Sequence, residues 1–160
     1  MEAIPARSGL AKYFAYGSNM ASEVMADWCA EHRFLGPARL DGYRLLFLRR
    51  SVRWKAGAAD VVPDDGAATW GALYELSAAD LDALDEKEFA PQGGYQRREV
   101  EVTTDDGSRH TALTYEVVEK APHELAPKQE YVDLLVRGAT ERGLPNDWIT
   151  VLKELPRRFA

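Results

Sequence analysis

Short segments with the composition of β-strands fill the middle of the chain, and turn residues such as Pro63–Gly66 and Asp105–Gly107 separate them. Apolar runs and alternation predict strands at 13–16, 40–48, 56–62, 69–76, 95–104 and 109–118. Helical patterns at 20–29, 77–88, 128–142 and 146–155 interrupt and flank these strands, with Asn146 as the expected cap of the last helix. This order predicts an α+β fold in which helices flank a mixed or barrel-like sheet.

The size of the chain predicts one domain, residues 1–160, with a core that needs no covalent staple. Its one cysteine, Cys29, cannot form an internal disulfide, and we expect it to be a small core residue. The three histidines, His32, His110 and His123, are far apart in the sequence and none has another plausible ligand beside it. A metal site is therefore not expected.

The charge and hydropathy of the chain exclude two classes of partner. A formal net charge of −6 argues against a nucleic-acid-binding module, which needs a basic field. No apolar run approaches the roughly 20 residues of a membrane span, and the opening segment, MEAIPARSGLAKY, lacks the apolar core of a secretory signal. We expect a cytoplasmic protein with no nucleic-acid or membrane partner. The sequence leaves the oligomeric state open.

A strand–turn–helix pattern at residues 13–19 is the first place that could carry chemistry. Gly17 follows the aromatic strand, and a glycine there lets the backbone approach a ligand closely. The start of the next helix offers unpaired N–H groups, which together with the helix dipole form an anion site. The alternative is a plain strand-to-helix turn in which Ser18 or Asn19 caps the helix.

The end of the helix predicted at 77–88 is the second such place. Ser77 and Asp80 have the spacing of a capping box. At about 100° per residue, Glu88 falls on the apolar face of the helix and the neighbouring Glu86 falls on the opposite face. An inward carboxylate is costly unless it is paired or functional, and burial would make it a better base. The alternatives are that the helix frays before Glu88, or that Arg97 or Arg98 pairs with it.

Several other polar features are expected to be structural. The basic clusters at 49–53 and 157–158 are interpreted as solvated surface. The four tryptophans are interpreted as core or as the walls of a pocket.

The segment from Tyr13 to Met20, YFAYGSNM, resembles the opening signature of the gamma-glutamylcyclotransferase family, which includes the plant AIG2-like proteins. Residues 84–88, LDEKE, are similar to the acidic helix end of the family, and Tyr95 follows at the family's spacing. The segment from Tyr131 to Trp148 is similar to its C-terminal helix and turn. The resemblance covers about residues 12–150.

The resemblance implies a small mixed β-barrel flanked by helices, and an enzyme that converts a γ-glutamyl amide to 5-oxoproline with release of the amine. It implies that Glu88 is the general acid/base, and that backbone amides of Tyr16, Gly17 and Ser18 hold the γ-glutamyl group. The implied substrate-binding residues are Tyr13, Phe14, Ala15, Tyr16, Gly17, Ser18, Tyr95 and Tyr131. A small γ-glutamyl molecule is the only partner implied, and neither a metal nor another cofactor is.

One residue departs from the family pattern. The position after the catalytic glutamate is usually glycine, and here it is Phe89. A bulky side chain beside the base could narrow the pocket and favour small leaving groups. The alternative function is a binding module that keeps the fold and the loop but does not turn over a substrate.

Overall fold

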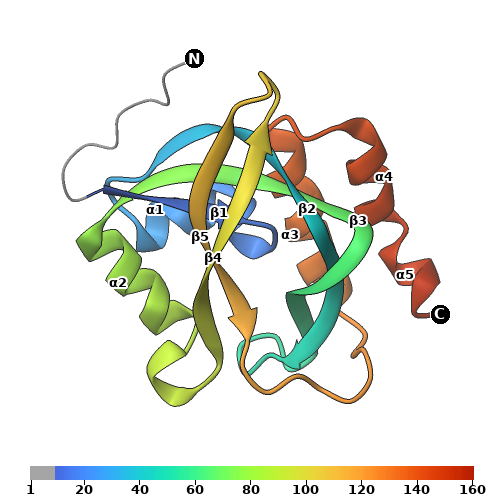
Figure 1. Cartoon of the computed structure of the whole chain (residues 1–160). Helices are drawn as coiled ribbons and strands as arrows, with labels where there is room; N and C mark the ends of the chain where they lie inside the picture. The colour runs from blue at the N-terminus through green and yellow to red at the C-terminus, as the bar shows by residue number, and fades with distance from the viewer. Residues whose placement is uncertain (1–9) are drawn as a thin grey trace.

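A closed β-barrel forms the centre of the computed structural model, which describes residues 10–160 (Figure 1). The opening residues 1–9, and with them most of the segment judged for a secretory signal, lie outside the described range. The barrel strands are β1 (Leu10–Ala15), β2 (Arg33–Arg50), β3 (Gly57–Ser77), β4 (Tyr95–Thr104) and β5 (Arg109–Val117). The helices are α1 (Ser22–Trp28), α2 (Ala78–Lys87), α3 (Gln129–Glu141), α4 (Asn146–Lys153) and α5 (Leu155–Arg158), with 3-10 turns η1 (Ser18–Met20) and η2 (Ala90–Gln92).

The strand order β1-β3-β2-β4-β5 closes through a parallel contact between β1 and β5, at Tyr13 and Leu113. All other neighbours are antiparallel, so the sheet is mixed. In Figure 1, α2 lies on one side of the barrel, and α4 and α5 lie on the other. The predicted fold class, a small mixed barrel flanked by helices, is confirmed.

The prediction that the chain reverses at Pro63–Gly66 is wrong, because strand β3 continues through these residues. The turn residues form a bulge instead. Asp41 pairs with Ala68 and Tyr43 pairs with Pro63, so Gly42 alone faces residues 64–67. Bulges bend and twist a strand, and this lets the long pair β2–β3 curve around the barrel. The predicted strands at 40–48, 56–62 and 69–76 are therefore parts of two longer strands.

The helix predicted at 20–29 begins later than expected. Ser18 and Asn19 belong to η1, and Ala21 precedes α1 with no side-chain capping bond. The predicted caps are therefore wrong, and Asn146 is likewise the first residue of α4 rather than its cap. The segment between η1 and α1 is held in place by its contact with α3 at Gly138. A Cβ at residue 138 would lie 2.7 Å from the Ala21 nitrogen, so only glycine allows this contact. The small residue lets α3 pack directly on the backbone after η1.

The core fills the barrel and the space beneath α3. Phe14, Phe47, Tyr74 and Leu135 are completely buried, and so is Cys29, as expected. None of the helices in residues 10–160 is long and apolar enough to cross a membrane.

Candidate active site

A small cavity of about 30 Å³ lies where the end of β1 meets the end of α2. We call it the inner cavity. Its lining residues come from six separate parts of the chain: Tyr13, Tyr16, Gly17, Ser18, Asn19, Ala59, Glu88, Tyr95, Tyr115 and Tyr131. The structure therefore brings Glu88 together with most of the residues predicted to bind substrate. Phe14 and Ala15 are the exceptions, because they are buried in β1 and pair with β3.

Helix α2 carries Glu88 to the cavity. The Ser77 hydroxyl accepts a hydrogen bond from the Asp80 N–H (3.1 Å), which caps the helix as predicted. At the other end, the Glu88 N–H donates to the Leu84 carbonyl (2.8 Å), so the last turn is intact. The alternative that the helix frays before Glu88 is therefore wrong. The Glu88 side chain is 14% exposed.

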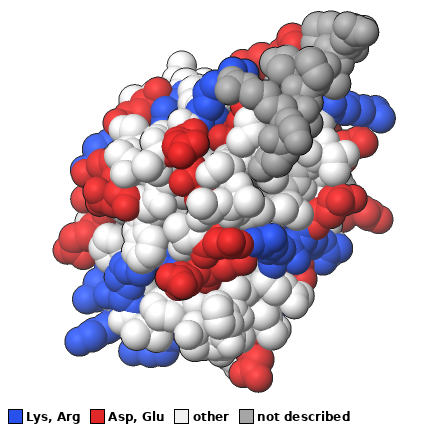
Figure 2. All heavy atoms as spheres, turned by 90° about the vertical axis from the view of Figure 1, so that its left-hand side faces the viewer, with Lys and Arg blue, Asp and Glu red and all other residues white. Residues whose placement is uncertain are grey.

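The ion-pair partner of Glu88 is Lys87, not the arginines considered from the sequence. The Lys87 ammonium lies 2.8 Å from Glu88 Oε1 and is 6% exposed. Arg97 pairs with Asp82 and Asp85 on the outer side of α2. Figure 2 shows the side of the molecule on which α2 lies, with acidic and basic side chains next to one another.

Arg98 is also committed elsewhere, because it binds the Glu116 carboxylate at 2.7 Å. Both arginines are thus occupied away from the cavity. The alternative that one of them pairs with Glu88 is wrong. Among residues 10–160, the ion-pair partner of the inward Glu88 is therefore its neighbour Lys87.

Phe89 directly after Glu88 has a left-handed backbone conformation, with φ 57° and ψ 33°. For a residue with a Cβ this conformation costs about 1–2 kcal/mol. Two hydrogen bonds hold the reversal: the Gly94 N–H donates to the Phe89 carbonyl (2.9 Å), and the Tyr95 N–H donates to the Glu88 carbonyl (3.2 Å). The same turn that fixes the backbone of Glu88 therefore starts β4 and places Tyr95 in the cavity wall.

Two tyrosine hydroxyls of the cavity are fixed by the backbone of one residue. The Tyr95 hydroxyl donates to the Ala59 carbonyl (2.8 Å), and the Ala59 N–H donates to the Tyr131 hydroxyl (3.0 Å). Tyr95 therefore keeps oxygen lone pairs for another donor, while Tyr131 keeps its hydrogen for another acceptor. Burial raises the pKa of both hydroxyls, and the nearby Glu88 charge acts in the same direction, so both stay protonated at neutral pH.

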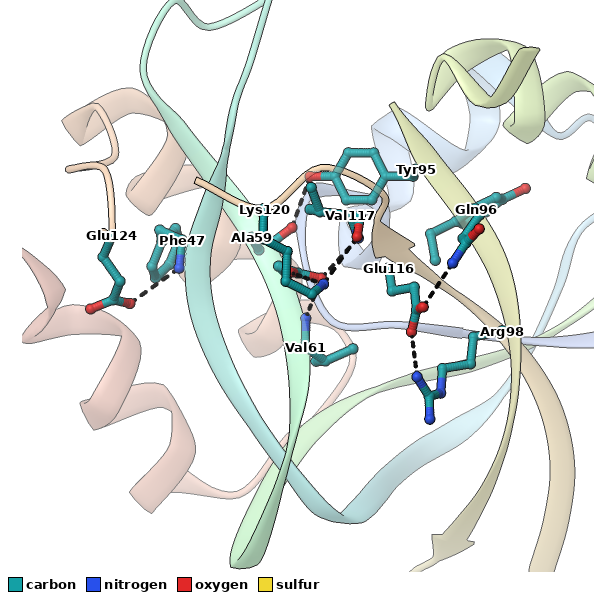
Figure 3. A network of polar contacts seen from close by, with 12 residues as sticks. Phe47, Ala59, Val61, Tyr95, Gln96, Arg98, Glu116, Val117, Lys120 and Glu124 are labelled. Atoms are coloured by element: carbon teal, nitrogen blue, oxygen red, sulfur yellow. Dashed lines mark hydrogen bonds and ion pairs between the residues drawn. The ribbon is translucent and has the colours of Figure 1, made fainter. Parts of the chain in front are cut away.

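The buried carboxylate of Asp60 holds this part of β3 in place (Figure 3). Its Oδ1 accepts from the N–H groups of Val61 and Val117, both at 2.9 Å. Its Oδ2 accepts from the Lys120 ammonium at 2.6 Å. Burial raises the pKa of Asp60, and these hydrogen bonds oppose the shift. In Figure 3 the Tyr95 hydroxyl points at Ala59, the residue directly before this anchor.

Asn19 is a cavity residue that the sequence analysis considered only as a cap. Its Nδ2 donates to the Tyr13 hydroxyl (2.8 Å). Its Oδ1 is buried and has no hydrogen-bond partner within residues 10–160. A buried acceptor without a donor is costly, and such groups often mark a ligand site. The signal in the sequence that could have identified Asn19 as a cavity residue is its position within the YFAYGSNM segment.

A second space, the outer cavity, adjoins the inner cavity at Glu88 and has a volume of about 40 Å³. It shares Ser18, Glu88, Tyr95 and Tyr131 with the inner cavity. Its remaining walls are Arg49, Ser51, Val52, Arg53, Trp54, Ala58, Lys87 and Phe89. The cluster at 49–53, interpreted from the sequence as solvated surface, thus contributes two arginines to a cavity next to Glu88. The interpretation is confirmed for Arg53, which is exposed, and is wrong for Arg49, which is half-buried.

A larger groove lies elsewhere, with about 780 Å³ between the β2–β3 bulge and helices α4 and α5. None of the residues predicted for the site lines it. The Glu88 carboxylate and the fixed hydroxyls of Tyr95 and Tyr131 line the two smaller cavities, so we place the candidate active site there.

Comparisons with known proteins show which proteins the chain is similar to. The model of the AIG2-like family matches residues 68–152, a range that includes Glu88, Tyr95 and Tyr131. Gamma-glutamylcyclotransferases of Homo sapiens and Mus musculus are each 32% identical over 149 residues, which is 89% of this chain and 77% of each relative. A solved gamma-glutamyl cyclotransferase structure superposes with a TM-score of 0.85 at 30% identity, over 90% of this chain and 86% of that one.

Proposed function

The chain belongs to the gamma-glutamylcyclotransferase family, and we propose that it converts a γ-glutamyl amide to 5-oxoproline with release of the amine, using Glu88 as general acid/base. The observation that carries this proposal is the inward carboxylate of Glu88 in a cavity it shares with the Tyr16–Ser18 loop. The prediction of a cytoplasmic location stays a prediction, as does that of one domain over residues 1–160.

The reaction needs no nucleophile from the protein, because the substrate carries its own. The α-amino nitrogen attacks the γ-carbonyl carbon, a five-membered lactam ring closes, and the bond to the leaving nitrogen breaks. The α-ammonium must first lose a proton, and the leaving nitrogen must gain one. A single carboxylate next to both nitrogens performs both transfers, and such a group contributes about 10²–10⁴-fold to the rate.

The remaining requirement is to hold the γ-glutamyl group folded back on itself, which is a problem of orientation. The N–H groups of Gly17 and Ser18 donate to no backbone carbonyl within the described residues. We assign them to the substrate carboxylate or to the oxyanion that develops on the γ-carbonyl. The hydrogen of the Tyr131 hydroxyl is directed to the same oxygen atoms, since its oxygen already accepts from Ala59.

The acceptors of the cavity suit the α-ammonium group. The unpartnered Oδ1 of Asn19 and the free lone pairs of Tyr95 can accept from its N–H groups, while Glu88 takes the proton. The Lys87 ammonium lies 2.8 Å from Glu88 Oε1 and helps to hold the carboxylate in position beside the substrate. Each polar group at the cavity thereby has a partner once the substrate is bound.

The test is 5-oxoproline release from a panel of γ-glutamyl amino acids and γ-glutamyl amines. Glu88→Gln keeps the shape of the side chain but cannot take a proton, and we expect kcat to fall by about 10²–10⁴-fold. Glu86→Gln is the matched control, because Glu86 is exposed on the same helix two residues away. It should leave the rate unchanged.

Two outcomes would contradict the proposal. Full activity in Glu88→Gln would mean that another group is the base. A wild-type protein that binds γ-glutamyl compounds, keeps that binding in Glu88→Gln and forms no 5-oxoproline would establish the alternative, a binding module of the same fold.

A further inference from the structure

The outer cavity is the place where the leaving group of the substrate must lie. This step rests on the proposed function. If the γ-glutamyl group fills the inner cavity, its scissile amide lies at Glu88, since that residue must reach the leaving nitrogen. The two cavities meet at Ser18, Glu88, Tyr95 and Tyr131. The released amine therefore extends into the outer cavity.

The outer cavity carries an excess of positive charge. Its charged lining residues are Arg49, Arg53, Lys87 and Glu88, and the last two neutralise each other. Neither Arg49 nor Arg53 has a carboxylate partner in the described part of the chain. Two guanidinium groups are thus left without a counter-charge beside the leaving-group side of Glu88.

Aromatic rings hold both guanidinium groups without neutralising them. Arg49 lies over the Tyr95 ring, 6.0 Å from its centre. Arg53 lies near two rings, 5.8 Å from the centre of Trp28 and 5.9 Å from that of Phe89. Ring faces orient an arginine and leave its N–H groups available. Phe89, which we expect to narrow the pocket, therefore also helps to position a cation.

We propose that Arg49 and Arg53 determine the leaving group, and that the preferred substrates are γ-glutamyl conjugates of acidic amino acids. Guanidinium groups bind carboxylates through paired, parallel hydrogen bonds. The released amine of such a substrate carries two carboxylates, one for each arginine. The products are 5-oxoproline and a free dicarboxylic amino acid.

The test compares kcat/KM for three substrates whose leaving amines differ in carboxylate number. γ-Glutamylglutamate has two, γ-glutamylalanine has one and γ-glutamylpropylamine has none. We expect kcat/KM to rise about fivefold with each carboxylate, the upper size of a partly exposed ion pair. Raising the ionic strength should reduce this difference, because salt screens exposed charges.

Arg49→Gln and Arg53→Gln should each lower the ratio of kcat/KM between γ-glutamylglutamate and γ-glutamylpropylamine by about fivefold. The ratio is measured within one preparation, so it does not depend on the fraction of protein that folds. Arg50→Gln is the matched control: Arg50 is exposed at the end of β2 and lines neither cavity. It should leave the ratio as in the wild type.

Three results would overturn the inference while leaving the proposed function intact. These are equal kcat/KM for the three substrates, a ratio unchanged in both arginine variants, and an equal fall of the ratio in Arg50→Gln. Absence of 5-oxoproline from all three substrates would instead refute the proposed function itself. The two failures are therefore distinguishable in one experiment.

Discussion

Substitution of Asp60 tests whether its buried carboxylate anchors the active site mainly as a hydrogen-bond acceptor or as a charge. Its Oδ1 accepts from two backbone N–H groups, of Val61 and Val117, and its Oδ2 accepts from Lys120. Asn keeps an oxygen at the Oδ1 position and loses the charge. Ala loses both oxygens. The two variants therefore separate the acceptor role from the ionic one.

The structure sets the size of each effect. In Asp60→Asn the two N–H groups stay bonded, and Lys120, whose side chain is 35% exposed, can turn to water. Asp60→Asn loses one charged hydrogen bond but also removes the cost of burying a charge. The free energy of unfolding should therefore fall by about 1–2 kcal/mol. In Asp60→Ala two buried N–H groups lose their acceptor at about 1–3 kcal/mol each, so we expect about 3–5 kcal/mol in total.

The assay is thermal and urea unfolding of the two variants beside the wild type. For a chain of this size, 1 kcal/mol corresponds to about 2–4 °C in Tm, so Asn should lower Tm by about 2–8 °C and Ala by about 6–20 °C. In Asp60→Ala the Tyr95 and Tyr131 hydroxyls should also lose their fixed position, because both bind the backbone of residue 59. Equal destabilisation by Asn and Ala would refute the reasoning, since it would mean that the charge carries the effect.

Three further predictions concern other positions. Gly17→Ala should leave Tm unchanged and raise KM, because the new methyl lies 3.4 Å from the Tyr131 hydroxyl in the inner cavity. Gly71→Ala should instead lower Tm strongly, because the new methyl would lie 2.3 Å from the Ala15 carbonyl oxygen. Burial, and then the charge of Lys12, lower the pKa of His110 below 6.5. As the pH drops below about 6.5, the unfolded chain therefore takes up a proton before the folded protein does, and the free energy of unfolding falls. His110→Gln should weaken that fall in urea unfolding at pH 5, 6 and 7. Phe89→Gly should change the free energy of unfolding by less than about 1 kcal/mol, because the relief of left-handed backbone strain offsets the greater entropy of glycine in the unfolded chain. The same variant should accept a wider range of leaving groups in the substrate panel. An unchanged range would show that Phe89 does not close the cavity.

The fold class could be predicted because it depends on patterns that are local in the sequence. Strand alternation, the Ser77 cap and the order of elements were sufficient for a mixed barrel with flanking helices. The turn at Pro63–Gly66 could not be interpreted correctly, since the same residues favour a chain reversal and a bulge. Which of the two forms depends on the partner strand β2, whose Gly42 faces the bulge across the sheet.

The inward direction of Glu88 could also be predicted, because helical periodicity alone determines it. Its partner could not. Arg97 and Arg98 follow Glu88 closely in the sequence, yet the alternation of β4 points them to Asp85 and to Glu116. The roles of Ala59 and Asn19 were equally hidden, since one acts through its backbone and the other through an acceptor that tertiary packing leaves without a donor.

Fixed hydroxyls and a paired base explain why so small a cavity suits this chemistry. Three polar groups of the inner cavity each have one bond already made by the protein: Tyr95 donates to Ala59, Tyr131 accepts from it, and Glu88 accepts from Lys87. The hydrogen-bonding capacity that each group has left is therefore fixed before a substrate enters: Tyr95 and Glu88 can still accept a hydrogen bond, and Tyr131 can still donate one. A folded-back γ-glutamyl group presents ammonium donors and carboxyl acceptors in the complementary order. Preorganisation of this kind lowers the cost of reaching the transition state, because the groups need not reorient as charge develops. We therefore expect the inner cavity to bind a folded-back γ-glutamyl group, the conformation that cyclises, in preference to an extended one.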